Sequence, residues 1–214
     1  MARSSTGAQG LVTGKIGNTY YYVRHGKQQM RAASHIIKPR SERQLAQQQR
    51  MSVLKPIISY LKLYIRVGFA LKGIEKADSA SNCFRSYNLM HAIKGQYPNQ
   101  EIDYPALRLS EGSLSLPLNA AVQSVNDGFK FTWTYDAQDP NGSPYDRTML
   151  MVYFPEADQP RFFQIISGVQ RSDEEELLNV PAAMKGRFAE TYISFITDDR
   201  SSISNSVYTG RVML

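Results

Sequence analysis

The residues that could support binding chemistry in this chain are cations, and they are concentrated in its first third. Residues 1–76 contain fourteen Lys and Arg against two acids, whereas residues 77–214 contain eleven Lys and Arg against seventeen acids. Cations neutralise phosphates, while nearby tyrosines can stack on bases and glutamines can hydrogen bond to them. The candidate residues for binding a polyanion are Lys15, Arg24, Lys27, Arg31, Arg40, Arg43, Arg50, Lys55, Lys62 and Arg66.

The same charge pattern is compatible with more than one partner. Opposite charges in the two parts of the chain could hold copies of the protein together head to tail. A basic amphipathic helix can also lie on an anionic membrane, although its apolar side is needed for the protein's own core. The sequence has no helix-turn-helix, zinc-finger or RNP-like pattern that would single out nucleic acid. Protein, including a second copy of this chain, and nucleic acid therefore stay open as partners.

Patterns that could support catalysis or hold a cofactor are incomplete. Residues 10–16 have the two glycines and the lysine of a phosphate-binding loop, but with three residues between the glycines and no Ser or Thr for magnesium. His25, His35 and His91 have no spacing that would bring ligands together on a metal. Cys83 and His91 would lie about 12 Å apart along one helix, too far for a nucleophile and its base. We therefore predict a protein that is not an enzyme and has no cofactor or metal.

Composition gives the broad class and compartment. The chain is 42% hydrophobic and 21% charged, which is typical of a globular protein. It has neither a secretory leader nor an apolar run long enough to cross a membrane. Its single cysteine excludes an internal disulfide. These features predict a cytoplasmic protein with no transmembrane segment.

The N-terminal region has the signals of a β-hairpin followed by helices. Residues 11–18 lead into the strand-like run 19–24, and after the turn signal at 25–27 the run 28–33 can return as its partner strand. Along the first of these strands Tyr20, Tyr22 and Arg24 share one side, while the residues between them share the other.

A capping box at residues 41–44 begins a helix, in which Pro56 should cause a kink or an end. Apolar residues at spacings of three and four give that region one buried side and one basic side. The basic side holds Lys55, Ser59, Lys62 and Arg66. A further helix is predicted from Ser79 to about Lys94, before the stop signal of Gly95.

After Pro98 the sequence changes to short alternating runs with turn signals between them, which is typical of a β-sandwich or barrel. Residues 129–135 are the clearest run, because every odd position is aromatic and every even position is polar. The predicted strands are 106–110, 113–116, 121–125, 129–135, 148–154, 161–166, 175–180, 190–197 and 206–213.

The C-terminal part resembles a fibronectin type III or related immunoglobulin-like sandwich. Trp133 lies in an early strand, and Tyr192 near the start of a late strand fits the tyrosine corner of such folds. Ser194 departs from this pattern, because an inward apolar residue is usual there. The resemblance implies a sandwich of about seven strands and implies nothing about a ligand.

The whole chain also resembles an uncharacterised bacterial family of about 200 residues, a domain of unknown function with no assigned activity to carry over. The matching pieces, in order, are GKIGN at 14–18, Gly26-Lys27, Arg31, the glutamine-rich run 44–50, Val67-Gly68-Phe69 and an Asn- and Tyr-containing helix at 82–93.

These observations predict an α+β fold with an N-terminal β-hairpin and two or three helices, followed by an all-β immunoglobulin- or fibronectin-III-like sandwich. The predicted domains are a basic hairpin-plus-helical region, 1–105, and a β-sandwich domain, 106–214. The predicted function is non-enzymatic binding or assembly, in which the sandwich makes protein–protein contacts. The alternative is nucleic-acid binding through the basic N-terminal region.

Overall fold

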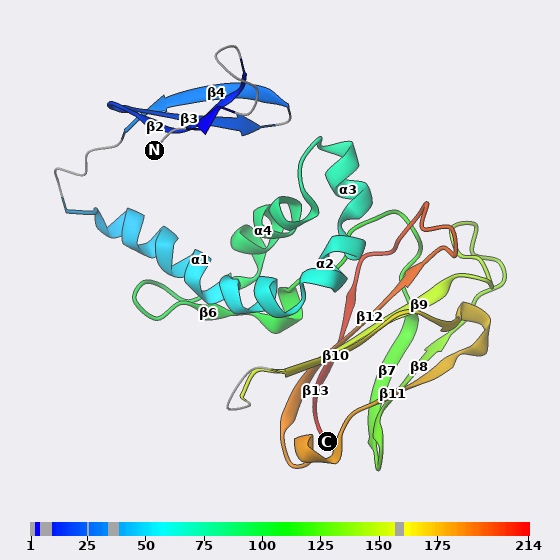
Figure 1. Cartoon of the computed structure of the whole chain (residues 1–214). Coiled ribbons are helices and arrows are strands. Elements are labelled where there is room, and N and C mark those ends of the chain that lie inside the picture. The colour runs from blue at the N-terminus through cyan, green and yellow to red at the C-terminus, as the bar shows by residue number, and fades with distance from the viewer. Residues whose placement is uncertain (1–2, 5–9, 25, 34–38, 157–160) are drawn as a thin grey trace. The chain divides into compact units, whose positions relative to one another are not determined.

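The computed structural model describes residues 3–4, 10–24, 26–33, 39–156 and 161–214. It divides into two compact units, Met1–Ser41 and Glu42–Leu214. The order of elements, an N-terminal sheet, four helices and then antiparallel sheets, confirms the predicted α+β class (Figure 1). His25 and His35 lie outside the described residues.

The first unit is a small antiparallel sheet with the strand order β1-β2-β3-β4. It confirms the predicted hairpin, formed by 19–24 and 27–32, and adds two strands in front of it. Gly17 and Gly26 occupy the two turns with positive φ, 56° and 74°, which glycine adopts without a steric penalty. The strands are β1 (Arg3–Ser4), β2 (Val12–Ile16), β3 (Thr19–Arg24) and β4 (Lys27–Ala32).

The second unit begins with four helices, and the first of them continues past Pro56. Where that helix gives way to the next, the helical hydrogen bond persists, from the Leu61 N–H to the Ile57 oxygen at 2.8 Å. Leu54, Ile57 and Leu61 are buried, whereas Lys55 is exposed, so the predicted amphipathic pattern is confirmed. The helices are α1 (Glu42–Tyr60), α2 (Lys62–Gly68), α3 (Ala70–Glu75) and α4 (Ala80–His91).

Helix α4 begins where the sequence predicts and ends earlier. The Ser79 hydroxyl accepts the Asn82 N–H at 3.2 Å, which caps the first turn. After His91 the chain forms β5 (Ile93–Lys94), which pairs with β6 (Glu101–Ile102). This pairing takes the last residues of the predicted helix into a strand.

The described residues of the C-terminal part form seven strands in two sheets. One sheet has the order β10-β9-β12-β13 and the other β11-β8-β7, and every pairing within them is antiparallel. The strands are β7 (Leu118–Val125), β8 (Gly128–Thr134), β9 (Arg147–Phe154), β10 (Arg161–Gln170), β11 (Glu175–Asn179), β12 (Phe188–Ile196) and β13 (Val207–Met213).

Two predicted strands, 106–110 and 113–116, are wrong. They belong to a connecting segment whose backbone bonds to scattered partners, such as the Leu109 N–H to the Ser206 hydroxyl at 2.8 Å and the Glu111 N–H to the Gly68 oxygen at 3.0 Å. In 106–110 the apolar alternation reports burial and not membership of a sheet, whereas in 113–116 it does not report burial either, because Leu116 is 46% exposed.

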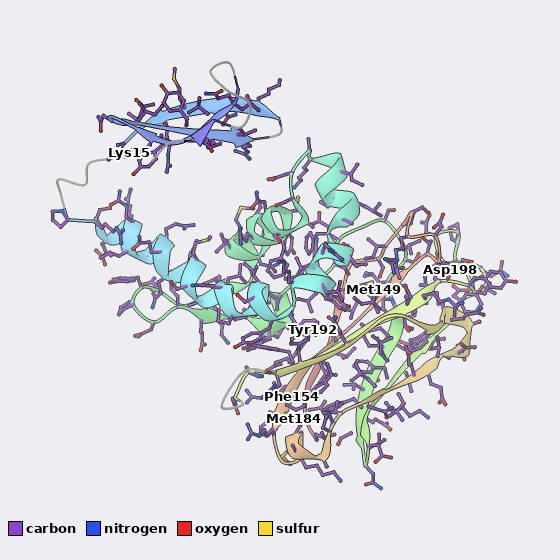
Figure 2. The ribbon with its side chains drawn as sticks, viewed as in Figure 1. Lys15, Met149, Phe154, Met184, Tyr192 and Asp198 are labelled. Carbon is purple, nitrogen blue, oxygen red and sulfur yellow. The ribbon has the colours of Figure 1, made fainter. Side chains whose placement is uncertain are left out.

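The sheet β10-β9-β12-β13 is covered on both faces, by the helices on one side and by β11-β8-β7 on the other (Figure 1). Along β9, Met149 and Met151 enter the core shared with the helices, whereas Leu150 and Phe154 enter the core of the sandwich. Figure 2 labels Met149 and Tyr192 on the helix-facing side, and Phe154 on the other. The predicted boundary between residues 105 and 106 stays a prediction.

A buried hydrogen bond explains the polar residue at Ser194. Its Oγ lies 3.2 Å from the Tyr64 hydroxyl, which donates to the Met149 oxygen at 3.1 Å. A hydroxyl has one proton to donate, so Ser194 must be the donor to Tyr64. The serine therefore faces the helices, and burial raises the pKa of Tyr64 well above its ordinary value.

Candidate polyanion-binding face

Strand register in the N-terminal sheet puts basic and aromatic side chains on one side. Residues directly opposite one another on paired antiparallel strands point to the same face. Tyr20 in the middle strand is opposite Lys15 on β2 and opposite Arg31 on β4. The Lys15 Nζ and the Arg31 Cζ each lie 5.7 Å from the centre of the Tyr20 ring. A cation therefore flanks this ring on either side; Figure 2 labels Lys15.

The same face continues along β3 towards its end. Tyr22 is opposite Gln29, and Arg24 is opposite Lys27. Tyr20 is 38% exposed and Tyr22 is 39% exposed, and the cations around them are exposed as well. We call this the cationic face, made of Lys15, Tyr20, Tyr22, Arg24, Lys27, Gln29 and Arg31.

The unit that carries the cationic face has no acid of its own. Residues 1–41 contain seven of the 25 Lys and Arg and none of the 19 Asp and Glu. The remaining 18 Lys and Arg stand against all 19 acids, so residues 42–214 have a net charge of −1. The entire excess positive charge of the chain therefore belongs to the small sheet and its flanking residues.

The opposite side of the sheet is largely apolar. Met30 is 72% exposed, Ile16 is 51% exposed and Val23 is 39% exposed. Tyr21 is opposite Met30 and shares this side with it. We call this the apolar face, made of Val12, Ile16, Tyr21, Val23 and Met30. The two faces of one sheet thus differ sharply in polarity.

The other candidate cations are placed elsewhere by the structure. Arg40 precedes α1 within the first unit, whereas the remaining five belong to the helices of the second unit. On those helices Arg50 is half-buried, and the other cations are exposed. These exposed residues are Arg43, Lys55, Lys62 and Arg66.

One of the helical cations lines a hollow. Lys55 borders a pocket of about 390 Å³ together with Ser52, Ser59 and Arg85. Arg85 comes from α4 and was not predicted, because sequence spacing within α1 gives no sign of which α4 residue packs against it. The Arg85 Nη1 donates to Asn82 Oδ1 at 3.3 Å.

Cys83 and His91, which the sequence offered as candidates for chemistry, pack against neighbouring residues of the fold. Cys83 is 4% exposed, and burial raises the pKa of its thiol. His91 is exposed, and its ring lies 4.6 Å from that of Tyr87. Across the described part of the chain, no group of three His, Cys, Asp or Glu is placed to hold a metal ion. No helix among those residues has the length and apolar character to cross a membrane.

Buried charge is concentrated in the sandwich. The Arg171 guanidinium lies 3.3 Å from the Asp146 carboxylate and 4.4 Å from the centre of the Phe195 ring. It also donates to the backbone oxygens of Ser115 and Leu116, at 3.2 and 3.1 Å. With its partners supplied by the sandwich itself, Arg171 fixes a connecting loop and is not free to bind a ligand.

A second buried acid, Glu190, belongs to β12 and is opposite Arg211 of β13. Glu190 is 2% exposed and accepts the Tyr208 hydroxyl at 2.6 Å. Burial raises the pKa of Glu190, and the Tyr208 hydrogen bond and the nearby Arg211 oppose this rise. The Arg211 Nε is 3.9 Å from its carboxylate. The carboxylate is thus held by neighbours within the fold.

The chain belongs to a family of unknown function, DUF6266, whose model matches residues 7–210. This confirms the resemblance to an uncharacterised family of about 200 residues. No curated protein matches the chain.

The cationic face could have been predicted from the length of the first hairpin turn, which fixes the strand register. A two-residue hairpin turn at Gly17-Asn18 makes Ile16 the partner of Thr19, and so makes Lys15 the partner of Tyr20. Alternation correctly separated Tyr20 and Tyr22 from Tyr21, but only the register brings cations from neighbouring strands beside them.

Proposed function

We propose that this chain is a non-enzymatic binding protein whose N-terminal sheet binds nucleic acid through the cationic face. The observation that carries the proposal is the register that places Lys15, Arg24, Lys27 and Arg31 on one side with two half-exposed tyrosines. No acid occurs in residues 1–41 to neutralise them. In a complex with nucleic acid, the cations would neutralise phosphates and the aromatic rings would stack on bases.

The charge of the face sets the expected salt dependence. Each phosphate that a cation neutralises contributes about 0.7 to 0.9 to the slope of log affinity against log salt concentration. If all four cations of the face engage phosphates, the slope is about −3 to −4. Affinity should therefore fall steeply between about 50 and 200 mM salt.

The test is fluorescence anisotropy of labelled oligonucleotides titrated with the full chain. The double variant Lys15→Glu, Arg31→Glu reverses the two cations beside Tyr20 and should lose most of the binding. The matched control Lys76→Glu, Lys185→Glu makes the same charge change at exposed positions of the other unit and should retain it. Equal affinity of the two variants, or no binding by the unaltered protein at low salt, would overturn the proposal.

Protein–protein assembly is the second candidate, and the exposed apolar face of the N-terminal sheet favours it. Each Å² of apolar surface that such a contact removes from water contributes about 25 cal/mol in its favour. A head-to-tail contact between the basic N-terminal residues and an acidic surface of another copy would also weaken with salt. Light scattering across a dilution series at low and high salt tests this; a monomer at every concentration excludes self-assembly.

We also propose an immunoglobulin- or fibronectin-III-like relationship for the sandwich, supported by its strand order. Numbering its strands from the first, one sheet holds the first, second and fifth, and the other holds the fourth, third, sixth and seventh. An immunoglobulin constant domain has the same two sheets except that its fourth strand pairs with the fifth. Domains of this architecture bind many kinds of partner, so the strand order supports contact with protein without naming one.

A further inference from the structure

We infer that the nucleic acid bound by the cationic face is single-stranded, with one unstacked base resting on Tyr20 and the next on Tyr22. The inference rests on the proposed function and adds the form of the ligand. Tyr20 and Tyr22 are two residues apart on β3 and lie on the same face. Two residues of a strand span about 6.8 Å.

That spacing does not match a duplex. Successive phosphates of one strand of a DNA duplex rise by about 3.4 Å, half the distance between the two tyrosine positions. The faces of duplex bases are also covered by their neighbours in the stack. Adjacent nucleotides can therefore reach both rings only when the strand is extended and its bases are apart.

The position of the rings in the sheet favours stacking. Both tyrosines belong to β3, which has β2 on one side and β4 on the other. Tyr20 is paired on both sides, with Lys15 and with Arg31, whereas Tyr22 is paired with Gln29 of β4. The exposed fractions of the two tyrosines, 38% and 39%, leave surface on which a base can rest. Every base presents a π-face, so this contact does not depend on sequence.

Polar side chains surround the two tyrosine rings at the positions where the phosphates and base edges of a bound nucleic acid would lie. Lys15 and Arg31 are on opposite sides of Tyr20, so the phosphates flanking a base on this ring have a cation within reach. Gln29 is opposite Tyr22 and offers an amide to the edge of the second base. Arg24 and Lys27 continue the positive surface to the end of the strand. Strand β3 has six residues, about 20 Å, which gives room for about three extended nucleotides.

The first experiment measures the unaltered full chain against four labelled 12-mers by anisotropy at low salt: oligo-dT, oligo-U, a DNA duplex and an abasic DNA strand. The abasic strand keeps the phosphates and lacks the bases. We expect oligo-dT or oligo-U to bind at least about tenfold more tightly than the abasic strand, because base stacking contributes about 1–3 kcal/mol per base.

The second experiment uses matched tyrosine variants. Tyr20→Leu should weaken single-strand binding by about 5- to 150-fold, the equivalent of one lost stacking contact. Tyr21→Leu is the control, because this neighbour lies on the apolar face, and its affinity should stay within about twofold of the unaltered protein. Circular dichroism of both variants checks that the sheet is retained.

The two proposals fail in different ways. Equal binding of duplex, abasic and base-containing strands would overturn the single-strand inference and leave nucleic-acid binding in place. Equal affinities of the Tyr20 and Tyr21 variants would also overturn it. Absence of binding to all four oligonucleotides at low salt would overturn the proposed function itself. If Tyr20→Leu does not fold, the comparison with the abasic strand still decides the inference.

Discussion

The hydrogen bond between Tyr64 and Ser194 offers a direct test of how the helices pack on the sheet. Tyr64 is fully buried in α2, and its hydroxyl joins Ser194 on β12 to the Met149 oxygen on β9. The change Tyr64→Phe removes only the oxygen. It leaves the ring in place and deprives the Ser194 hydroxyl of its acceptor in a buried setting.

The expected cost follows from the loss of a buried partner. Leaving a buried polar group unsatisfied costs about 1–3 kcal/mol, whereas removing both partners can be nearly neutral. Tyr64→Phe should therefore lower the free energy of unfolding by about 1–2 kcal/mol, and Ser194→Ala by about 1 kcal/mol. The double variant should be less destabilised than the sum of the two, by about 0.5–1.5 kcal/mol.

Urea unfolding followed by circular dichroism gives these quantities. With a slope of about 2–3 kcal/mol per molar urea, a loss of 1–2 kcal/mol moves the midpoint by about 0.3–1 M. Tyr60→Phe is the control, because that tyrosine at the end of α1 is 38% exposed and should change stability by less than about 0.5 kcal/mol. Additive effects of the Tyr64 and Ser194 changes, within about 0.3 kcal/mol, would refute the hydrogen bond.

Three further changes test other parts of the second unit. Arg171→Met removes the cation beside the buried Asp146 carboxylate and should cost about 3–5 kcal/mol, seen as a drop in Tm of at least about 6 °C; a drop under 2 °C would contradict the pairing. Gly68→Ala places a Cβ against the Leu109 oxygen, inside van der Waals contact, so thermal unfolding should show a loss of about 1–3 kcal/mol; unchanged stability would mean that the helix and the connecting segment can separate freely. Because the raised pKa of Glu190 lets the folded state bind a proton more readily than the unfolded state, the stability that it contributes falls as pH rises from about 4.5 through the raised pKa. Glu190→Gln should flatten part of that decline in urea unfolding between about pH 4 and pH 8, and an identical pH profile would contradict this assignment.

The sandwich strands were predictable because each has at least one side in a core, and β9 and β12 are buried on both sides. Residues 129–135 alternate aromatic and polar side chains, and the structure has Phe129, Phe131 and Trp133 buried between the sheets. The segment 106–110 has similar alternation without a neighbouring strand to bond to. Periodicity reports which side chains are buried, and it does not report where backbone hydrogen bonds go.

The sequence predicted that this region is helical, but it did not predict where one helix ends and the next begins. The breaks fall at Leu61 and Phe69, which are buried apolar residues with no intrinsic tendency to end a helix. Both side chains lie in the core that the helices share with the sheet. Pro56 has the opposite outcome, because the helix continues through it to Tyr60 although the residue type favours an interruption.

The candidate face was predictable in residue type and only partly in geometry. The sequence indicated the cations and the alternation of Tyr20, Tyr21 and Tyr22, because both depend on neighbours along the chain. It did not separate Lys15 and Arg31 from cations such as Arg43 on α1. That distinction depends on strand register and on the division into two compact units.

The sharing of one core by helices and late strands has a consequence for synthesis on the ribosome. Tyr64 precedes Met149 by 85 residues and Ser194 by 130 residues. At about 5–20 residues per second, the helices wait about 7–26 s for the second of these partners. During that interval the apolar side of α1 and α2, which includes Leu54 and Ile57, has no sheet to cover it. The nascent chain should therefore be open to chaperones and proteases until β12 has emerged, and proteolysis of ribosome-stalled chains of increasing length would show when protection begins.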